Sequence, residues 1–116
     1  MAGEVLADLV GLGKETLFQQ TEAAKNVAAV MIASAFEDLL RRMGVELAGV
    51  IGRPSLQDVL NALKDKVVLK GGEIGTAQSF LKFRNDSLHA DWANVSRAQV
   101  DSCTAFIGAM LLRHFS

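Results

Sequence analysis

The chain has 116 residues with a formal net charge of −1, and half of its residues are hydrophobic. That length fits one domain, and the charge excludes a protein that coats nucleic acid or membranes through a general basic excess. A local phosphate site stays open, because it depends on the nearest few charges.

Two helices are predicted in the first part of the chain. A short helix over residues 4–12 should stop near Gly11 and Gly13. A long helix from about Glu15 to Met43 follows, because apolar residues recur there every three or four positions and Gly44 is a typical stop. Residues 1–20 are therefore expected to form either the short helix or a peripheral N-terminal segment.

Three helices are predicted in the rest of the chain. Ser55 and Asp58 resemble a capping box that opens a helix fading near Val67, and its apolar face carries Leu56, Val59, Leu60 and Leu63. The next helix starts near Glu73 and should end at Asn85 or a turn beyond. A second capping box, Ser96 and Gln99, opens a last helix that runs almost to Phe115.

These elements predict an all-α fold: an up-and-down bundle of four to five helices in a single domain over residues 1–116. The only strand-like piece, residues 67–69, is too short to require a sheet. Two of the helices are apolar over more surface than small neighbours can cover. We therefore expect a homodimer.

Cysteine, histidine and hydropathy limit the chemistry and the compartment. Cys103 is the single cysteine, so no internal disulfide forms, and we expect it to be a buried small hydrophobe. With only two histidines beside it, neither a protein metal site nor a cofactor is predicted. The chain start lacks a basic leader, and the longest apolar stretch, residues 27–36, is about half of what a bilayer needs. We expect a cytoplasmic protein without a membrane partner.

The segment over residues 83–92, FRNDSLHADW, concentrates the reactive side chains. Arg84 offers a planar fork of donors that matches two phosphate oxygens, and His89 can exchange a proton near neutral pH. These are the groups needed to cleave RNA without a metal: a base for the 2′-hydroxyl, a cation for the phosphorane and an acid for the leaving 5′-oxygen.

The spacing of Arg84 and His89 adds a geometric condition. On one continuous helix they lie about 140° apart, so a shared site requires the helix to end or loosen between them. Residues 85–87 are poor helix-interior and good turn residues, so we expect Arg84 near the helix end and His89 just beyond it. The plainer alternative is structural: Arg84 favours a helix C-terminus, Asp86 and Asp91 cap the next turn, His89 is semi-buried and Trp92 anchors the core.

The segment resembles the HEPN domain family, whose hallmark is an Arg, a polar residue and a His four to six residues after the Arg. Arg84, Asn85 and His89 match it, and the helical layout is similar over residues 21–115. The resemblance implies a helical bundle that dimerises to bring two motifs into one cleft. It also implies a metal-independent RNase of the kind found in toxin–antitoxin, abortive-infection and CRISPR systems, for which an antitoxin protein would be a partner.

Residue by residue, the resemblance makes Arg84 and His89 catalytic, with Asn85 in support. Neighbouring candidates for supporting or substrate-binding roles are Asp86, Ser87 and Trp92. Some branches of the family also carry acidic and basic residues on an earlier helix, which Glu37, Arg41 and Arg42 match as E-x-x-x-R-R. An ordinary i,i+4 ion pair between Glu37 and Arg41 explains that match equally well.

Two functional hypotheses remain. The first is an RNA-cleaving HEPN homodimer, a toxin or phage-defence component. The second is a non-catalytic HEPN-like module that binds nucleotides or mediates protein interaction and dimerisation. A helix-turn-helix DNA binder is disfavoured, because no helix carries a cluster of basic and polar residues and the last one is mostly apolar.

Overall fold

The computed structural model describes residues 3–116 and confirms the all-α class. Its described residues form five α-helices and one short 3₁₀ helix, η1, and residues 67–69 form no strand there. The helices are α1 Gly3–Leu17, α2 Glu22–Ala48, α3 Leu56–Asp65, α4 Gly72–Leu88, η1 Trp92–Asn94 and α5 Arg97–Phe115.

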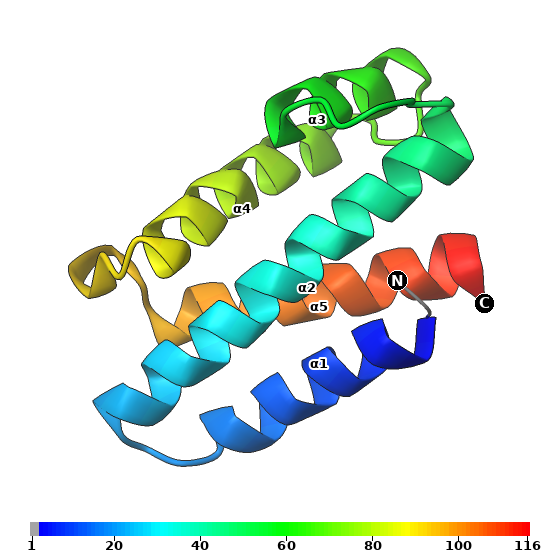
Figure 1. Cartoon of the computed structure of the whole chain (residues 1–116). Coiled ribbons are helices and arrows are strands. Elements are labelled where there is room, and N and C mark those ends of the chain that lie inside the picture. Colours follow the sequence, from blue (N-terminus) through cyan, green and yellow to red (C-terminus); the bar gives the residue numbers. More distant parts are fainter. Residues whose placement is uncertain (1–2) are drawn as a thin grey trace.

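Helix α2 is the centre of the bundle and contacts each of the other four α-helices (Figure 1). The predicted bounds, Glu15 to Met43, were wrong at both ends. The helix begins after Thr21, whose side chain accepts a hydrogen bond from the Ala24 N–H (3.0 Å), and it ends at Gly49 with a φ of 66°. Gly44 does not stop the helix. It is buried, and a Cβ there would lie 2.7 Å from Val59 Cγ1.

Helix α1 is longer than the predicted segment 4–12, because neither Gly11 nor Gly13 ends it. Gly13 is buried instead, where a Cβ would lie 2.7 Å from Cδ1 of Ile32 on α2. The glycine therefore allows close packing between α1 and α2. Leu6 and Val10 of α1 belong to the same hydrophobic core as α2.

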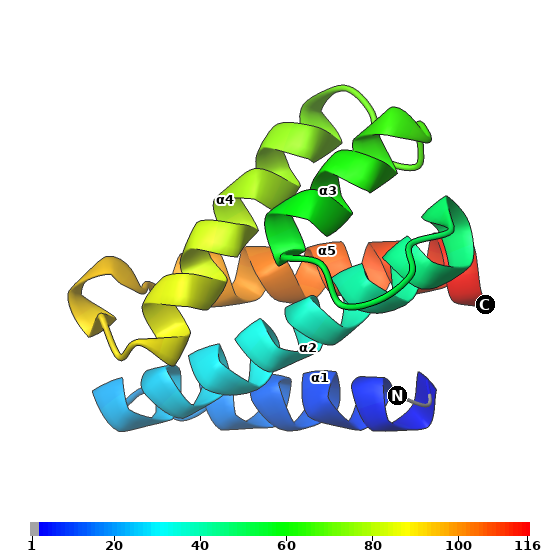
Figure 2. The same ribbon diagram turned by 45° about the horizontal axis from the view of Figure 1, so that its top comes forward.

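Helices α3 and α4 form a hairpin that packs on α2 (Figure 2). The predicted cap of α3 is confirmed, since the Ser55 side chain accepts a hydrogen bond from the Asp58 N–H (3.1 Å). Burial of three of the four predicted apolar residues, Val59, Leu60 and Leu63, orients α3 toward the core. This hairpin brings the second half of α4 alongside the middle of α2.

Helix α5 begins at the predicted capping box, in which Ser96 and Gln99 exchange both side-chain hydrogen bonds with backbone N–H groups. It buries Cys103 completely, as expected, and burial raises the pKa of that thiol. Thiolate chemistry at Cys103 is correspondingly suppressed.

Three phenylalanine rings join α2, α4 and α5 in the core. Phe36 lies 5.8 Å from Phe80 and 6.2 Å from Phe106 between ring centroids, and Phe80 and Phe106 are 5.5 Å apart. Phe36 is fully buried. The cluster fixes how α4 lies across α2, which matters because the next residue on α2 is Glu37.

A buried lysine holds the segment between α4 and α5. Lys25 on α2 donates hydrogen bonds to the carbonyl oxygens of Val95 (2.7 Å) and Trp92 (3.4 Å), and its Nζ lies 2.7 Å from Glu22 Oε1. These bonds satisfy a cation whose side chain is 8% exposed. They tie η1, just beyond His89, to the first turn of α2.

Part of α2 is open to solvent and apolar. Val27 is 47% exposed and Val30 is 38% exposed. The homodimer expected from excess apolar surface stays a prediction, for which these side chains are candidate contacts. Over residues 3–116, no helix combines the length and the hydropathy needed to cross a bilayer.

Candidate functional site

Arg84 points from α4 onto α2. Phe80 and Leu81, four and three residues earlier, are buried on the same face of α4, so the helical period directs Arg84 toward the centre of the bundle. Its Nη2 and Nε donate hydrogen bonds to Glu37 Oε1, at 2.6 and 3.0 Å. The side chain keeps 25% of its surface exposed, so it lies at the edge of the core and not within it.

Glu37 joins two arginines. Its Oε2 accepts a hydrogen bond from Arg41 Nε at 3.3 Å, while Oε1 holds Arg84. Arg41 Nη1 also donates to the Pro54 carbonyl, at 3.0 Å, and so reaches the loop before α3. The i,i+4 pair exists, but it is half of a larger arrangement that links α2, α4 and this loop.

Arg42 does not join this cluster. One residue further around α2, it pairs with Glu46 (3.5 Å) and places its guanidinium 4.1 Å from the centre of the Phe115 ring. Of the three candidates on α2, the fold brings Glu37 and Arg41 to Arg84 and directs Arg42 toward the end of α5.

The environment of Glu37 makes its charge stabilising. Burial alone raises the pKa of this carboxyl, but hydrogen bonds and charges from Arg84 and Arg41 outweigh burial, so the pKa lies below its usual 4.5. A lowered folded-state pKa contributes stability above the unfolded value, and that contribution is lost as the pH falls through the folded value.

We therefore expect Glu37→Gln to lower the free energy of unfolding by roughly 1 kcal/mol at neutral pH, a modest figure because the pair is partly solvated. The difference from wild type should shrink as the pH falls below 4.5. Urea unfolding at a series of pH values measures it, with the exposed Glu46→Gln as control. A gap that does not depend on pH would contradict the charge pairing.

Asn85 connects Arg84 to the solvent side of α4. Arg84 Nη1 donates to Asn85 Oδ1 at 2.8 Å. Four residues on, His89 follows Asn85 around the axis by only about 40°. The prediction that α4 ends between Arg84 and His89, at Asn85 or a turn beyond, is confirmed, because α4 ends at Leu88 and His89 is its C-cap. The last turn stays regular, since the His89 N–H bonds to the Asn85 carbonyl (3.0 Å).

The backbone at His89 is fixed by the way α4 ends. His89 is the C-cap, and Ala90 adopts a left-handed φ of 57°. The Asp91 N–H bonds to the Asp86 carbonyl (2.8 Å) and the Ala90 N–H to the Ser87 carbonyl (3.3 Å), the bonds of a Schellman motif. A non-glycine residue in this conformation is strained and held by its surroundings. His89 itself is exposed.

The other candidates near the motif, Asp86, Ser87 and Trp92, do not join the cluster of Arg84 and Glu37. Asp86 pairs with Lys82 at 2.7 Å, and Ser87 is 1% exposed, with a buried hydroxyl that has no hydrogen-bond partner in the described part of the chain. Trp92 packs half-buried against the core. Ser87 and Trp92 thus face the protein, whereas Asn85 and His89 face solvent.

A pocket of about 550 Å³ opens between α3 and α4 beside Arg84. We call it the α3–α4 pocket. Its walls carry three cations and three amides, Arg41, Lys82, Arg84, Gln57, Gln78 and Asn85, and no carboxylate of residues 3–116 lines it. Glu37 pairs with both arginines and Asp86 pairs with Lys82, so two carboxylates behind the walls offset the three cations in part. The positive charge that remains, together with the amides, suits an anion that also carries hydrogen-bonding groups.

The arginines keep donors for such an anion. A guanidinium has five N–H groups. In residues 3–116, Arg84 uses three of them, on Glu37 and Asn85, and Arg41 uses two, on Glu37 and the Pro54 carbonyl. Two N–H groups of Arg84 and three of Arg41 remain, while Glu37 holds both guanidinium groups in place.

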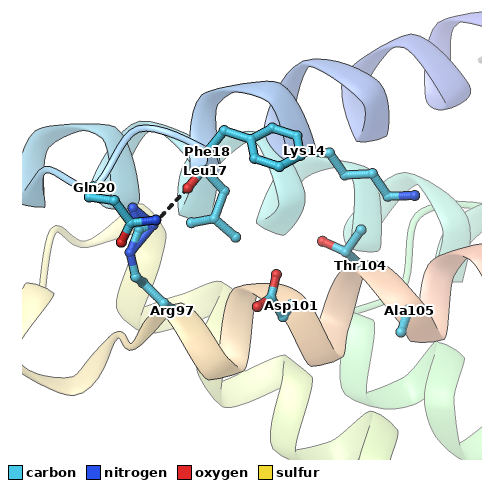
Figure 3. A pocket seen from close by; sticks show the side chains of 8 residues that line it. All are labelled: Lys14, Leu17, Phe18, Gln20, Arg97, Asp101, Thr104 and Ala105. Carbon is cyan, nitrogen blue, oxygen red and sulfur yellow. Dashed lines mark hydrogen bonds between the residues drawn. The ribbon is translucent and has the colours of Figure 1, made fainter.

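A second pocket, of about 500 Å³, lies where the end of α1 meets α5 (Figure 3). Arg97 reaches across it and donates to the Leu17 carbonyl (2.9 Å) and to the Gln19 carbonyl. Leu17 and Phe18 give it a more apolar wall. Its arginine is thus engaged in joining the α1–α2 loop to α5.

No protein-family model, curated protein or solved structure matches this chain. The function of this site is therefore inferred from its geometry and from the short motif of Arg84, Asn85 and His89. Within residues 3–116, no three His, Cys, Asp or Glu side chains gather closely enough to hold a metal ion.

Sequence reasoning missed part of the pocket. Gln57 and Gln78 were not singled out, and Lys82 was not connected to the motif. A signal was present for α4, because Gln78, Lys82, Asn85 and His89 follow one another at intervals of four, three and four residues. That spacing forms a polar stripe along one helix face.

Proposed function

We propose that the chain is a metal-independent endoribonuclease of HEPN type that acts as a homodimer and serves as a toxin or phage-defence component. The observation that carries the proposal is the convergence of Glu37 and Arg41 with Arg84 and Asn85 beside a cationic pocket. Two sequence matches that lie 47 residues apart meet at one place.

The groups fit the chemistry of RNA cleavage. An imidazole takes the proton of the 2′-hydroxyl, the 2′-oxygen attacks the adjacent phosphorus, the bond to the 5′-oxygen breaks, and a second proton goes to that leaving oxygen. His89 is the proton-transfer group, and the free N–H groups of Arg84 and Arg41 bind the charged phosphorane. One chain offers one imidazole here, so a dimer supplies base and acid together.

Incubation of the purified protein with single-stranded RNA in excess EDTA tests the proposal. We expect cleavage that leaves a 2′,3′-cyclic phosphate, and a dimer by light scattering. A product with a 3′-hydroxyl, or activity that appears only when a divalent metal is added, would contradict the assignment.

One observation favours the alternative, a non-catalytic module that binds nucleotides or a partner protein. Arg84 donates three of its N–H groups to residues of its own chain, as a structural arginine does. This alternative predicts a stable dimer with no cleavage of any RNA. The EDTA experiment therefore distinguishes the two.

A further inference from the structure

A smaller pocket adjoins the α3–α4 pocket at the loop between α2 and α3. Arg41 lines both pockets, and it shares the first with Arg84 and the second with Arg53. The second pocket, which we call the loop pocket, has a volume of about 200 Å³ and an apolar wall of Val45, Val50 and Val59. No carboxylate of residues 3–116 lines it.

Arg53 offers its whole guanidinium group to a ligand. It is exposed, and within residues 3–116 its side chain makes no hydrogen bond and no ion pair, so five N–H donors remain. Arg41 keeps three donors, and its one carboxylate partner, Glu37, is shared with Arg84. The charge of Arg53 is therefore not offset by a paired carboxylate in the described part of the chain.

The backbone on both sides of Arg53 is restricted. Gly52 has a left-handed φ of 74°, which glycine adopts at little cost. Pro54 has a fixed φ and confines the preceding Arg53 to extended conformations. The Pro54 carbonyl accepts a hydrogen bond from Arg41 Nη1, at 3.0 Å, which ties the loop to α2. Arg53 therefore loses little backbone entropy when a ligand binds.

We propose that Arg53 and Arg41 bind a backbone phosphate of an RNA strand, next to the nucleotide that occupies the α3–α4 pocket. The planar fork of a guanidinium group matches two phosphate oxygens. Because Arg41 lines both pockets, a strand that crosses it carries its next phosphate into the loop pocket. The inference rests on the proposed RNase function for its choice of RNA, and it adds a second backbone contact outside the motif.

The sizes of the two pockets agree with this division. Ligand pockets usually measure about 300–1,000 Å³, and the α3–α4 pocket, at about 550 Å³, falls within that range. The loop pocket, at about 200 Å³, is too small for a whole nucleotide and suits a single phosphate group. Its valine wall excludes water on one side, which strengthens the attraction between guanidinium and phosphate. Such a contact is independent of the base.

The alternative explanation is that Arg53 is an ordinary surface cation that only keeps the chain soluble. Loss of Arg53 would then affect RNA binding no more than loss of any other exposed cation. Lys66 provides the comparison, because it is exposed at the C-cap of α3 and lines neither pocket. It lies about 16 Å along the helix axis from the N-cap, beyond a Debye length of roughly 10 Å.

The test measures binding of a fluorescent uracil hexanucleotide, 2′-O-methylated so that the 2′-oxygen cannot attack, over a series of salt concentrations. In Arg53→Gln, the slope of the logarithm of the association constant against the logarithm of the salt concentration should be smaller in magnitude by about 0.7, the loss of one phosphate contact. Affinity in roughly 50 mM salt should fall by about threefold or more. Arg53→Lys, which keeps the charge, should keep the wild-type slope.

Lys66→Gln is the matched control, since it removes the same charge and should bind the hexamer as wild type does. An unchanged slope in Arg53→Gln, an equal loss in Lys66→Gln, or absence of binding by wild type would overturn the inference. So would displacement of the hexamer by inorganic phosphate at constant ionic strength, which would indicate a site for the free anion. Cleavage of unmodified RNA in EDTA by wild type separates the two proposals. An Arg53-dependent slope without cleavage supports this inference alone, and cleavage without such a slope supports the RNase alone.

Discussion

His89→Ala should slow metal-independent RNA cleavage by orders of magnitude while the fold is retained. Loss of a proton-transfer group lowers a rate by about 10²- to 10⁴-fold. His89 is exposed at the C-cap of α4, and its side chain makes no hydrogen bond with the described residues. The free energy of unfolding should therefore change by no more than about 0.5 kcal/mol. Initial cleavage rates in EDTA, together with a thermal melt, measure both effects.

The other histidine provides the control. His114 is half-buried near the end of α5, where burial first and the charge of Arg113 second lower its pKa, and its Nε2 has no hydrogen-bond partner among residues 3–116. His114→Ala should cleave RNA at the wild-type rate. If His89→Ala and wild type cleave equally fast, His89 is not the catalytic group.

Helix ends could be predicted where the signal is local. Ser55 and Ser96 cap α3 and α5 as expected, because a hydroxyl three residues before a free N–H acts within one turn. Gly13 and Gly44 misled the prediction, because each lies inside a helix and allows a neighbouring side chain to approach closely. Here Ile32 and Val59 lie against the two glycines, and such close packing is a tertiary property.

In the candidate site, too, the local features could be predicted from the sequence and the tertiary contacts could not. The motif Arg84, Asn85 and His89 is visible in the sequence because its members are close together. The pairing of Glu37 with Arg84 spans 47 residues and depends on how α4 crosses α2, which no local pattern contains. The last turn of α4 over residues 85–87 lies within the predicted end of the helix, although Asn, Asp and Ser have low helix propensities, because burial of Phe83 and Ser87 on the same helix outweighs them.

The crossing of α4 over α2 depends on Phe36, which gives the second large prediction. Phe36 contacts both Phe80 and Phe106 and has no exposed surface. Phe36→Ala should lower the free energy of unfolding by about 3–5 kcal/mol, through lost burial and the cavity left behind. For a domain of this size the melting temperature should fall by roughly 10–20 °C. Because Phe36 directly precedes Glu37, the hydrogen bonds from Arg84 to Glu37 should weaken as well.

Phe18→Ala is the matched control, since Phe18 is 82% exposed and its removal should change stability by at most about 0.5 kcal/mol. Phe36→Leu keeps most of the volume and should lose only about 1–2 kcal/mol, so a folded variant is available if alanine prevents folding. Equal melting temperatures for the Phe36 and Phe18 variants would mean that α4 does not pack on α2 through this ring. The meeting of Arg84 with Glu37 would then lose its structural basis.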